Sequence, residues 1–280
     1  MKCAWQEYLD LLPIWMRNDV DKQGRDSLLE LRLRIHKPPT LVTTNGVLDL
    51  DRCVSIDDIQ FCINMASEYS PWNAASISNG YITASGGHRI GICGQTVNKN
   101  GCMTGIRSPN SLCIRVARDY PGIAKYADSV TGSVLVIGPP GSGKTTLLRD
   151  LIRRRSLCEF VSVVDEREEI FPVSYNRILF QIGRHTDVLS GWAKDVGIDC
   201  VLRSMSPTII AVDEITAQRD CDALIKAAGC GVKLLATAHA TSADDLTRRP
   251  IYRAILNAGI FDHLLVMHSD KSWHIERMEL

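Results

Sequence analysis

The segment from Gly138 to Thr145, Gly-Pro-Pro-Gly-Ser-Gly-Lys-Thr, restricts the possible folds of this 280-residue chain more than any other segment. It matches the pattern G-x-x-x-x-G-K-[ST], which requires a buried strand before it and a helix after it. Both are predicted, because the apolar run 134–137 precedes the segment and TTLLRDLIRR follows it. The sequence therefore predicts a phosphate-binding loop between a strand and a helix.

The backbone of such a loop explains its chemistry. Glycines let several N–H groups converge on one anion, and the N-terminus of the next helix adds partial positive charge. Lys144 is expected to reach the β- and γ-phosphates, and Thr145 to offer its hydroxyl to Mg²⁺. The candidate nucleotide-binding residues are Gly138, Pro139, Pro140, Gly141, Ser142, Gly143, Lys144, Thr145 and Thr146.

A second apolar strand, 208–212, ends in two adjacent acids, Asp213 and Glu214. A carboxylate at a strand end can lie beside the metal, so Asp213 is expected to act on Mg²⁺ through water. Glu214 is expected to polarise the attacking water. Two adjacent acids favour hydrolysis over static nucleotide binding, although a solvated strand end would give the same pattern.

Two more apolar strands, 160–164 and 234–237, run into polar residues. The carboxyl ends of strands line the ligand crevice of open α/β sheets. Glu166, in the acidic run DEREE, is therefore expected to order water or metal. Thr237 or His239 is expected to sense the γ-phosphate.

An arginine is also expected at the site, because a cation over the developing charge accelerates phosphoryl transfer. Loss of one such electrostatic contact typically costs about 2.7–4 kcal/mol in barrier height. Arg89 and Arg115 are the preferred candidates. The other candidates are Arg118, Arg184 and Arg203.

The pattern of the chain changes near residue 125. The earlier part mixes strands and helices: residues 29–35 alternate between apolar and charged side chains, and Asn45-Gly46 predicts a hairpin whose two central residues tolerate positive φ. Ser55 resembles a capping-box residue at the start of a helix. The later part alternates five apolar strands with helical stretches, which predicts a parallel sheet covered on both faces.

Composition excludes several protein classes. Lys and Arg together number 32, as do Asp and Glu, and neither half is strongly basic, which argues against a general nucleic-acid binder. The ten cysteines are scattered without C-x-x-C or zinc-ligand spacing, which favours reduced thiols in a cytosolic protein. No stretch of 18 uncharged apolar residues is present, so a spanning helix is not expected.

The segment 201–241 resembles the core of the type II and type IV secretion ATPases, with a Leu-Arg pair before the metal-binding strand and a His box after it. Eight ordered motifs narrow the resemblance to the stage III sporulation protein AA family. They cover nearly all of the chain from about residue 28. The motifs are GGHRIGICG, IRVAR, PPGSGKTTLLRD, VVDEREEI, RHTDVLSG, RSMSP, AVDEI and TAHA.

The resemblance implies an α/β protein with a RecA-like P-loop NTPase core over 126–280, preceded by a smaller α+β N-terminal domain over 1–125. It implies a cytoplasmic ATPase that uses ATP and Mg²⁺, forms a homo-oligomeric ring such as a hexamer, and powers or gates the channel between mother cell and forespore during sporulation. Its partners would be integral membrane proteins of that complex, which could hold it peripherally at the membrane.

The same resemblance places ATP between the two domains, where Arg89 and Arg115 could reach the phosphates. One departure stands out: secretion ATPases usually carry an arginine shortly after the glutamate that corresponds to Glu214, and Thr216 stands there in this chain.

Two alternatives remain open from the sequence. A RecA-like helicase would use the same core, but the charge balance and the lack of an aromatic and basic stretch weigh against a nucleic-acid partner. A nucleotide-gated scaffold with little turnover would also use the phosphate-binding loop. The adjacent acids Asp213 and Glu214 favour hydrolysis over the scaffold.

Overall fold

The computed structural model describes residues 1–68, 80–99, 102–174 and 177–278. The chain divides into two compact units, Met1–Asp119 with Val173–Leu179, and Tyr120–Pro172 with Phe180–Leu280. The first break lies a few residues before the predicted boundary at residue 125. No sequence pattern indicates that the segment Val173–Leu179 groups with the first unit.

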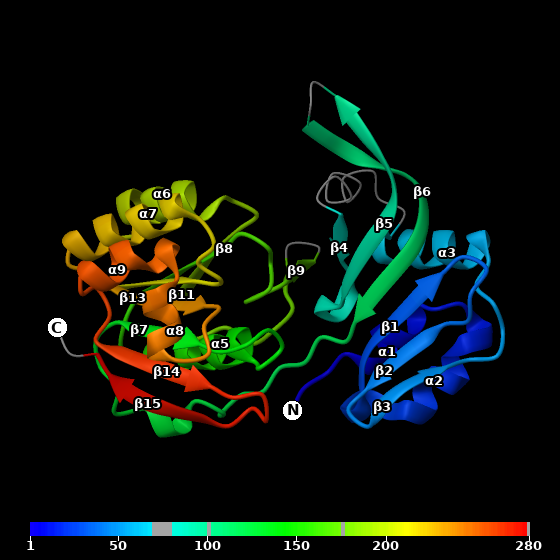
Figure 1. Cartoon of the computed structure of the whole chain (residues 1–280), viewed down its shortest axis with the longest axis horizontal. Helices are drawn as coiled ribbons and strands as arrows, with labels where there is room; N and C mark the ends of the chain where they lie inside the picture. The colour runs from blue at the N-terminus through cyan, green and yellow to red at the C-terminus, as the bar shows by residue number, and fades with distance from the viewer. Residues whose placement is uncertain (69–79, 100–101, 175–176, 279–280) are drawn as a thin grey trace. The chain divides into compact units, whose positions relative to one another are not determined.

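The first unit contains a six-stranded antiparallel sheet of order β3-β2-β1-β6-β5-β4 (Figure 1). Within the residues that the structure describes, helices α1, α2 and α3 contribute to the core on this sheet. Its core joins Tyr8, Leu12 and Met16 from the helical N-terminal region to Leu31 and Leu33 on the sheet. The strands and helices are β1 Leu28–Arg34, β2 Thr40–Thr43, β3 Gly46–Asp49, β4 Tyr81–Thr83, β5 Arg89–Lys99, β6 Cys102–Arg115, α1 Trp5–Asp10, α2 Ile14–Ser27 and α3 Ile56–Ser67.

Strand β1 departs from the predicted alternation at its start. Leu31 and Leu33 are buried as expected, but Leu28 is buried in place of Leu29, which is 37% exposed. The register of pairing with β2 shifts between Leu28 and Glu30. A shift of one residue moves a side chain to the other face of a sheet, which explains the exposure of Leu29.

The hairpin between β2 and β3 forms as predicted, but its turn is one residue earlier. Thr43 pairs with Gly46, so Thr44 and Asn45 connect the strands. Only Gly46 has a positive φ, of 137°. The expectation that both Asn45 and Gly46 occupy the turn centre with positive φ is therefore wrong.

Helix α3 begins as the sequence predicts. The Ser55 hydroxyl accepts a hydrogen bond from the N–H of Asp58 at 3.1 Å, and the Asp58 carboxylate accepts one from the N–H of Ser55 at 2.8 Å. This reciprocal pair is a capping box, which satisfies two N–H groups that the helix leaves unpaired.

The second unit contains a seven-stranded sheet of order β11-β8-β12-β13-β7-β14-β15, in which only β15 runs antiparallel to its neighbour. All five predicted strands are present, and the two strands that the sequence missed, β11 and β15, form the edges. The elements are β7 Val134–Ile137, α5 Lys144–Arg155, β8 Val161–Asp165, β11 Thr186–Ser190, α6 Lys194–Ser204, β12 Ile209–Val212, α7 Gln218–Gly229, β13 Lys233–Ala238, α8 Ala243–Arg248, α9 Arg253–Asn257, β14 His263–Met267 and β15 Trp273–Arg277.

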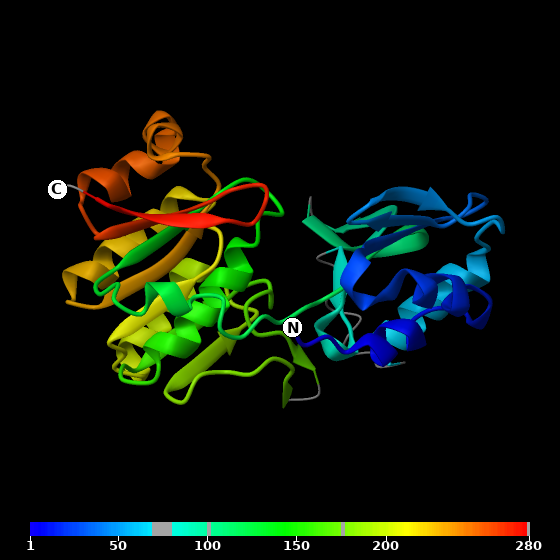
Figure 2. The ribbon, with the colours of Figure 1, turned by 90° about the horizontal axis from the view of Figure 1, so that it is seen from below.

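Helices cover both faces of this sheet, as Figure 2 shows from below. Val134 and Val136 of β7 pack with Leu148 of α5 in one apolar cluster. Leu135 and Ile137 of the same strand belong to a second cluster, which includes residues of α6 and α7. Burial on both faces explains why the central strands are continuous apolar runs. Among the described residues, no helix combines the length and apolarity needed to cross a bilayer.

Candidate nucleotide-binding site

The phosphate-binding loop connects β7 to α5, as the motif predicts. Gly141 and Gly143 have φ of 75° and 100°, values that side chains with a Cβ rarely adopt. At Gly138 a Cβ would lie 2.7 Å from the Ser142 hydroxyl and 2.8 Å from the carbonyl of Met267. Glycine at 138 therefore lets the loop lie against the end of β14.

Lys144, the first residue of α5, is turned toward the loop itself. Its ammonium donates to the carbonyls of Gly138 and Pro139, each at 3.0 Å, and lies 3.1 Å from Nδ1 of His239. Burial lowers the pKa of Lys144, against the opposing effect of the Asp213 and Glu214 carboxylates. The ammonium therefore occupies a partly desolvated position among oxygen and nitrogen acceptors, and an anion would replace those partners.

Thr145 and Asp213 lie together, although 67 residues separate them in the sequence. The Thr145 hydroxyl donates to one Asp213 carboxylate oxygen at 2.7 Å. The other oxygen accepts a hydrogen bond from the hydroxyl of the buried Thr237. Mg²⁺ prefers hydroxyl, carboxylate and phosphate oxygens, so this pair beside the loop is a donor set that fits the ion.

Glu214 is held in an unusual conformation at the end of β12. Its φ is 45°, a left-handed value that costs energy for a residue with a side chain. Its N–H lies within hydrogen-bond distance of the Thr237 hydroxyl (2.8 Å) and of an Asp213 oxygen (3.0 Å). Thr237 therefore holds both acids in place, and the phosphate-sensing role expected for Thr237 or His239 stays a prediction.

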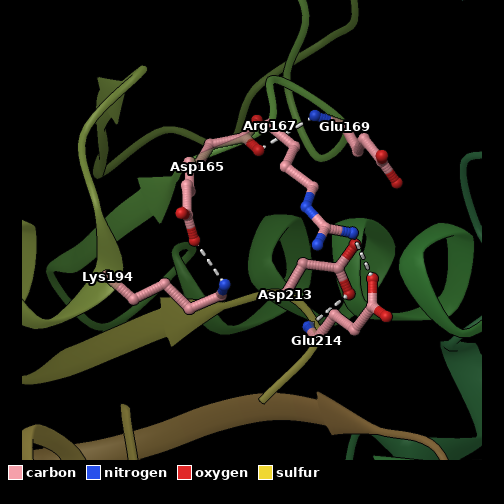
Figure 3. A pocket seen from close by; sticks show the side chains of 7 residues that line it. Asp165, Arg167, Glu169, Lys194, Asp213 and Glu214 are labelled. Atoms are coloured by element: carbon pink, nitrogen blue, oxygen red, sulfur yellow. Dashed lines mark hydrogen bonds and ion pairs between the residues drawn. The ribbon is translucent and has the colours of Figure 1, made fainter. Parts of the chain in front are cut away.

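The Glu214 carboxylate has a partner on each oxygen. Oε1 lies 3.0 Å from Nε2 of His239, and Oε2 accepts a hydrogen bond from Nη1 of Arg167 at 2.8 Å. Figure 3 shows the Arg167 side chain reaching from the loop after β8 toward Asp213 and Glu214. The sequence pattern does not mark Arg167, because this residue stands inside a run of four acidic residues.

The acidic residues of the run 165–169 have different surroundings. Asp165, the last residue of β8, is buried and accepts hydrogen bonds from the N–H groups of Glu169, Ile170 and Phe171. Burial raises the pKa of Asp165 to about 7, against the lowering effect of these donors, with a further increase from Asp213. Asp165 thus shapes the loop that follows β8.

Glu166 lines the same pocket as Asp213 and Glu214. Its carboxylate pairs with the ammonium of Lys194 at 2.5 Å. The Lys194 side chain is only 4% exposed and also lies 4.0 Å from Asp220. No sequence signal marked Lys194, which begins α6 three residues after the motif RHTDVLSG and lies outside all eight motifs. Glu166 therefore lies in the pocket beside Asp213 and Glu214, and the Lys194 ammonium neutralises its charge.

Arg89 and Arg115 belong to the first unit, and the phosphate-binding loop belongs to the second. They pair across β5 and β6. The Arg89 guanidinium stacks over the ring of Tyr81 at 4.1 Å, and the Arg115 guanidinium lies 3.6 Å from a carboxylate oxygen of Glu30. Their catalytic roles stay predictions.

A family model described as "Sporulation stage III, protein AA" matches residues 6–275. The chain belongs to the stage III sporulation protein AA family. A member of this family from Bacillus subtilis is 34% identical over 95% of this chain and 91% of its own length. The resemblance expected from the eight motifs is thereby confirmed.

This chain is also similar to a plant protein and to solved structures. The protein SEEDLING PLASTID DEVELOPMENT 1 of Arabidopsis thaliana is 26% identical over 89% of this chain and 35% of its own length. The ADP-bound pilus retraction motor PilT superposes with a TM-score of 0.61 at 12% identity, over 96% of this chain and 84% of PilT. The ATPase DotB of Yersinia pseudotuberculosis gives 0.58 at 15% identity, over 94% and 77%. These similarities confirm the expected fold, a RecA-like core preceded by a smaller domain.

Proposed function

We propose that this chain is a secretion-type ATPase whose second unit hydrolyses ATP to ADP and phosphate. The observation that carries the proposal is the 2.7 Å hydrogen bond between Thr145 and Asp213. It joins the phosphate-binding loop to the end of β12, and so brings the predicted metal-binding oxygens and the predicted water-activating acid Glu214 to one place. The secretion-ATPase fold and the membership in the sporulation family support the same assignment.

Each residue of the site has a separate role in the proposed hydrolysis. Lys144 and the loop N–H groups bind the β- and γ-phosphates. Glu214 accepts a proton from a water molecule while the oxygen of that water attacks the γ-phosphorus. The bond from that phosphorus to the bridging oxygen breaks, and ADP leaves with the electron pair. Thr145, and Asp213 through water, would hold Mg²⁺, which supplies charge neutralisation at the phosphates when bound.

The larger assembly is also part of the proposal. The chain would form a homo-oligomeric ring, such as a hexamer, and power or gate the channel complex between mother cell and forespore. Its partners would be integral membrane proteins of that complex, and the chain would lie in the cytoplasm, peripheral to the membrane through them. Family membership supports this role, together with the fold shared with a pilus motor.

Two substitutions test the ATPase. Lys144→Ala is expected to abolish turnover because the phosphates lose their charged partner, whereas Glu214→Gln is expected to retain ATP and hydrolyse it slowly. Arg249→Ala is the control, because the Arg249 side chain is 46% exposed and its ion pair with Asp245 measures 3.1 Å. Phosphate release and calorimetric binding are the measurements. Undiminished turnover by Lys144→Ala would contradict the assignment.

A further inference from the structure

A chain of four side chains runs from the phosphate-binding loop to the surface of the second unit. The Lys144 ammonium lies 3.1 Å from Nδ1 of His239, and Nε2 of that ring lies 3.0 Å from Glu214. The other Glu214 oxygen pairs with Arg167 at 2.8 Å. The loop lysine and the Arg167 guanidinium are therefore separated only by one imidazole and one carboxylate.

The pocket around Glu214 is rich in carboxylates and contains two cations of different character. Lys194 is buried, and its ammonium neutralises the carboxylate of Glu166. The Arg167 side chain is 45% exposed. Across the part of the chain that the structure describes, its partner is Glu214. Arg167 is thus the pocket cation with the freedom to move to a ligand.

A terminal phosphate bound by Lys144 would approach the carboxylate of Glu214. Two anions in a partly buried site repel each other strongly, so binding and catalysis need a cation between them. A guanidinium presents five N–H donors in a plane and can hold a carboxylate and a phosphate oxygen together. Arg167 already makes the carboxylate half of such a bridge.

We infer that Arg167 contacts the terminal phosphate of the bound nucleotide and supplies, from the same unit as the phosphate-binding loop, the cation that stabilises the developing charge. This inference rests on the proposed ATPase function and deepens it. Secretion ATPases usually carry the arginine for this role after the strand that corresponds to β12, where this chain has Thr216. Arg167 would take the same role from the end of β8. A terminal phosphate contact also means that Arg167 distinguishes triphosphate from diphosphate.

The first experiment measures binding. Calorimetry on the full chain gives Kd for ADP and for the β,γ-imido analogue of ATP, with Mg²⁺ present. Arg167→Ala is expected to weaken the triphosphate analogue by about ten- to a hundredfold, the range for a hydrogen bond to a charged group, and to leave ADP binding within about twofold. Arg167→Lys is expected to recover part of the loss, and Arg249→Ala, which removes an equally exposed arginine from its ion pair with Asp245, is expected to change neither value.

The second experiment separates contact with phosphate from orientation of Glu214. Arg167→Ala is expected to lower kcat by about a hundred- to a thousandfold. In a Glu214→Gln background, Arg167→Ala should still weaken the triphosphate analogue, because the phosphate contact remains to be lost. If the substitution has no effect in that background, Arg167 acts only through Glu214 and the inference is wrong.

The outcomes also separate this inference from the proposed function. A wild-type chain that binds no triphosphate contradicts both. A wild-type chain that hydrolyses ATP while Arg167→Ala keeps the same preference for triphosphate contradicts the inference and leaves the ATPase assignment standing. Equal weakening of ADP and triphosphate by Arg167→Ala would assign the arginine to the general structure of the loop, and would likewise overturn the inference.

Discussion

Thr237 offers a direct test of how the fold holds the two adjacent acids. Its hydroxyl donates to Asp213 and accepts from the N–H of Glu214, and its side chain is fully buried in β13. Thr237→Val keeps the shape of the side chain and removes both hydrogen bonds. The change leaves a partly buried Asp213 oxygen with one donor fewer, next to the point where Glu214 adopts a left-handed φ.

The size of the effect follows from these contacts. A hydrogen bond to a charged group contributes about 1.5–3 kcal/mol, so we expect Thr237→Val to lower the free energy of unfolding by about 2–3 kcal/mol. For a unit of this size, each kcal/mol lowers Tm by about 2–4 °C, which predicts a decrease of about 4–12 °C. Turnover should fall as well, because Glu214 loses one of the contacts that fix it.

Scanning calorimetry of the full chain and a phosphate-release assay make the measurement. Thr237→Ser is the matched control, since it retains the hydroxyl and loses one buried methyl group, a cost of about 0.8 kcal/mol. A Tm for Thr237→Val within about 1 °C of the wild type, or the same loss of Tm in Thr237→Ser and Thr237→Val, would refute the argument that the hydroxyl fixes the acids.

Two further predictions concern Asp165 and Ser55. Burial raises the pKa of Asp165 to about 7, so between about pH 4 and pH 7 the folded chain holds a proton that the unfolded chain releases. The contribution of Asp165 to the free energy of unfolding is therefore present at low pH and is lost as the pH rises toward 7. In urea titrations between about pH 4 and pH 7, Asp165→Asn should remove this decrease in the free energy of unfolding. The same pH dependence in the variant and the wild type would contradict the prediction. Ser55→Ala should cost about 1 kcal/mol of stability in the first unit, because α3 loses its capping box, and a denaturation midpoint equal to that of the wild type would disprove this.

The sequence predicted most of the second unit because its signals are local. A strand buried on both faces is a continuous apolar run, and the glycines at 141 and 143 mark a loop with positive φ. The two missed strands lie at the edges of the sheet, where only part of the surface is buried and polar residues are tolerated. The sequence TDVLS of β11 has no apolar run for this reason.

In the candidate site, too, local motifs mark some residues, whereas the partners of those residues come from distant segments. The residues that the motifs single out, Lys144, Thr145, Asp213 and Glu214, lie together at the carboxyl ends of the central strands, because parallel strands bring these ends together. Their roles in binding and catalysis stay predictions. The partners of these residues could not be read from the motifs. Arg167 and Lys194 come from segments whose local patterns indicate an acidic loop and an ordinary helix start.

The amino-acid sequence by itself determined the phosphate-binding loop, the central strands and the family, since each depends on the order of neighbouring residues. Only the tertiary structure decided that Arg167 meets Glu214 and that Lys194 neutralises Glu166. Those pairs depend on the order β11-β8-β12-β13-β7 across the sheet. That order is a property of long-range packing, because it brings side chains from separate strand ends within hydrogen-bond distance and no short stretch of sequence encodes it.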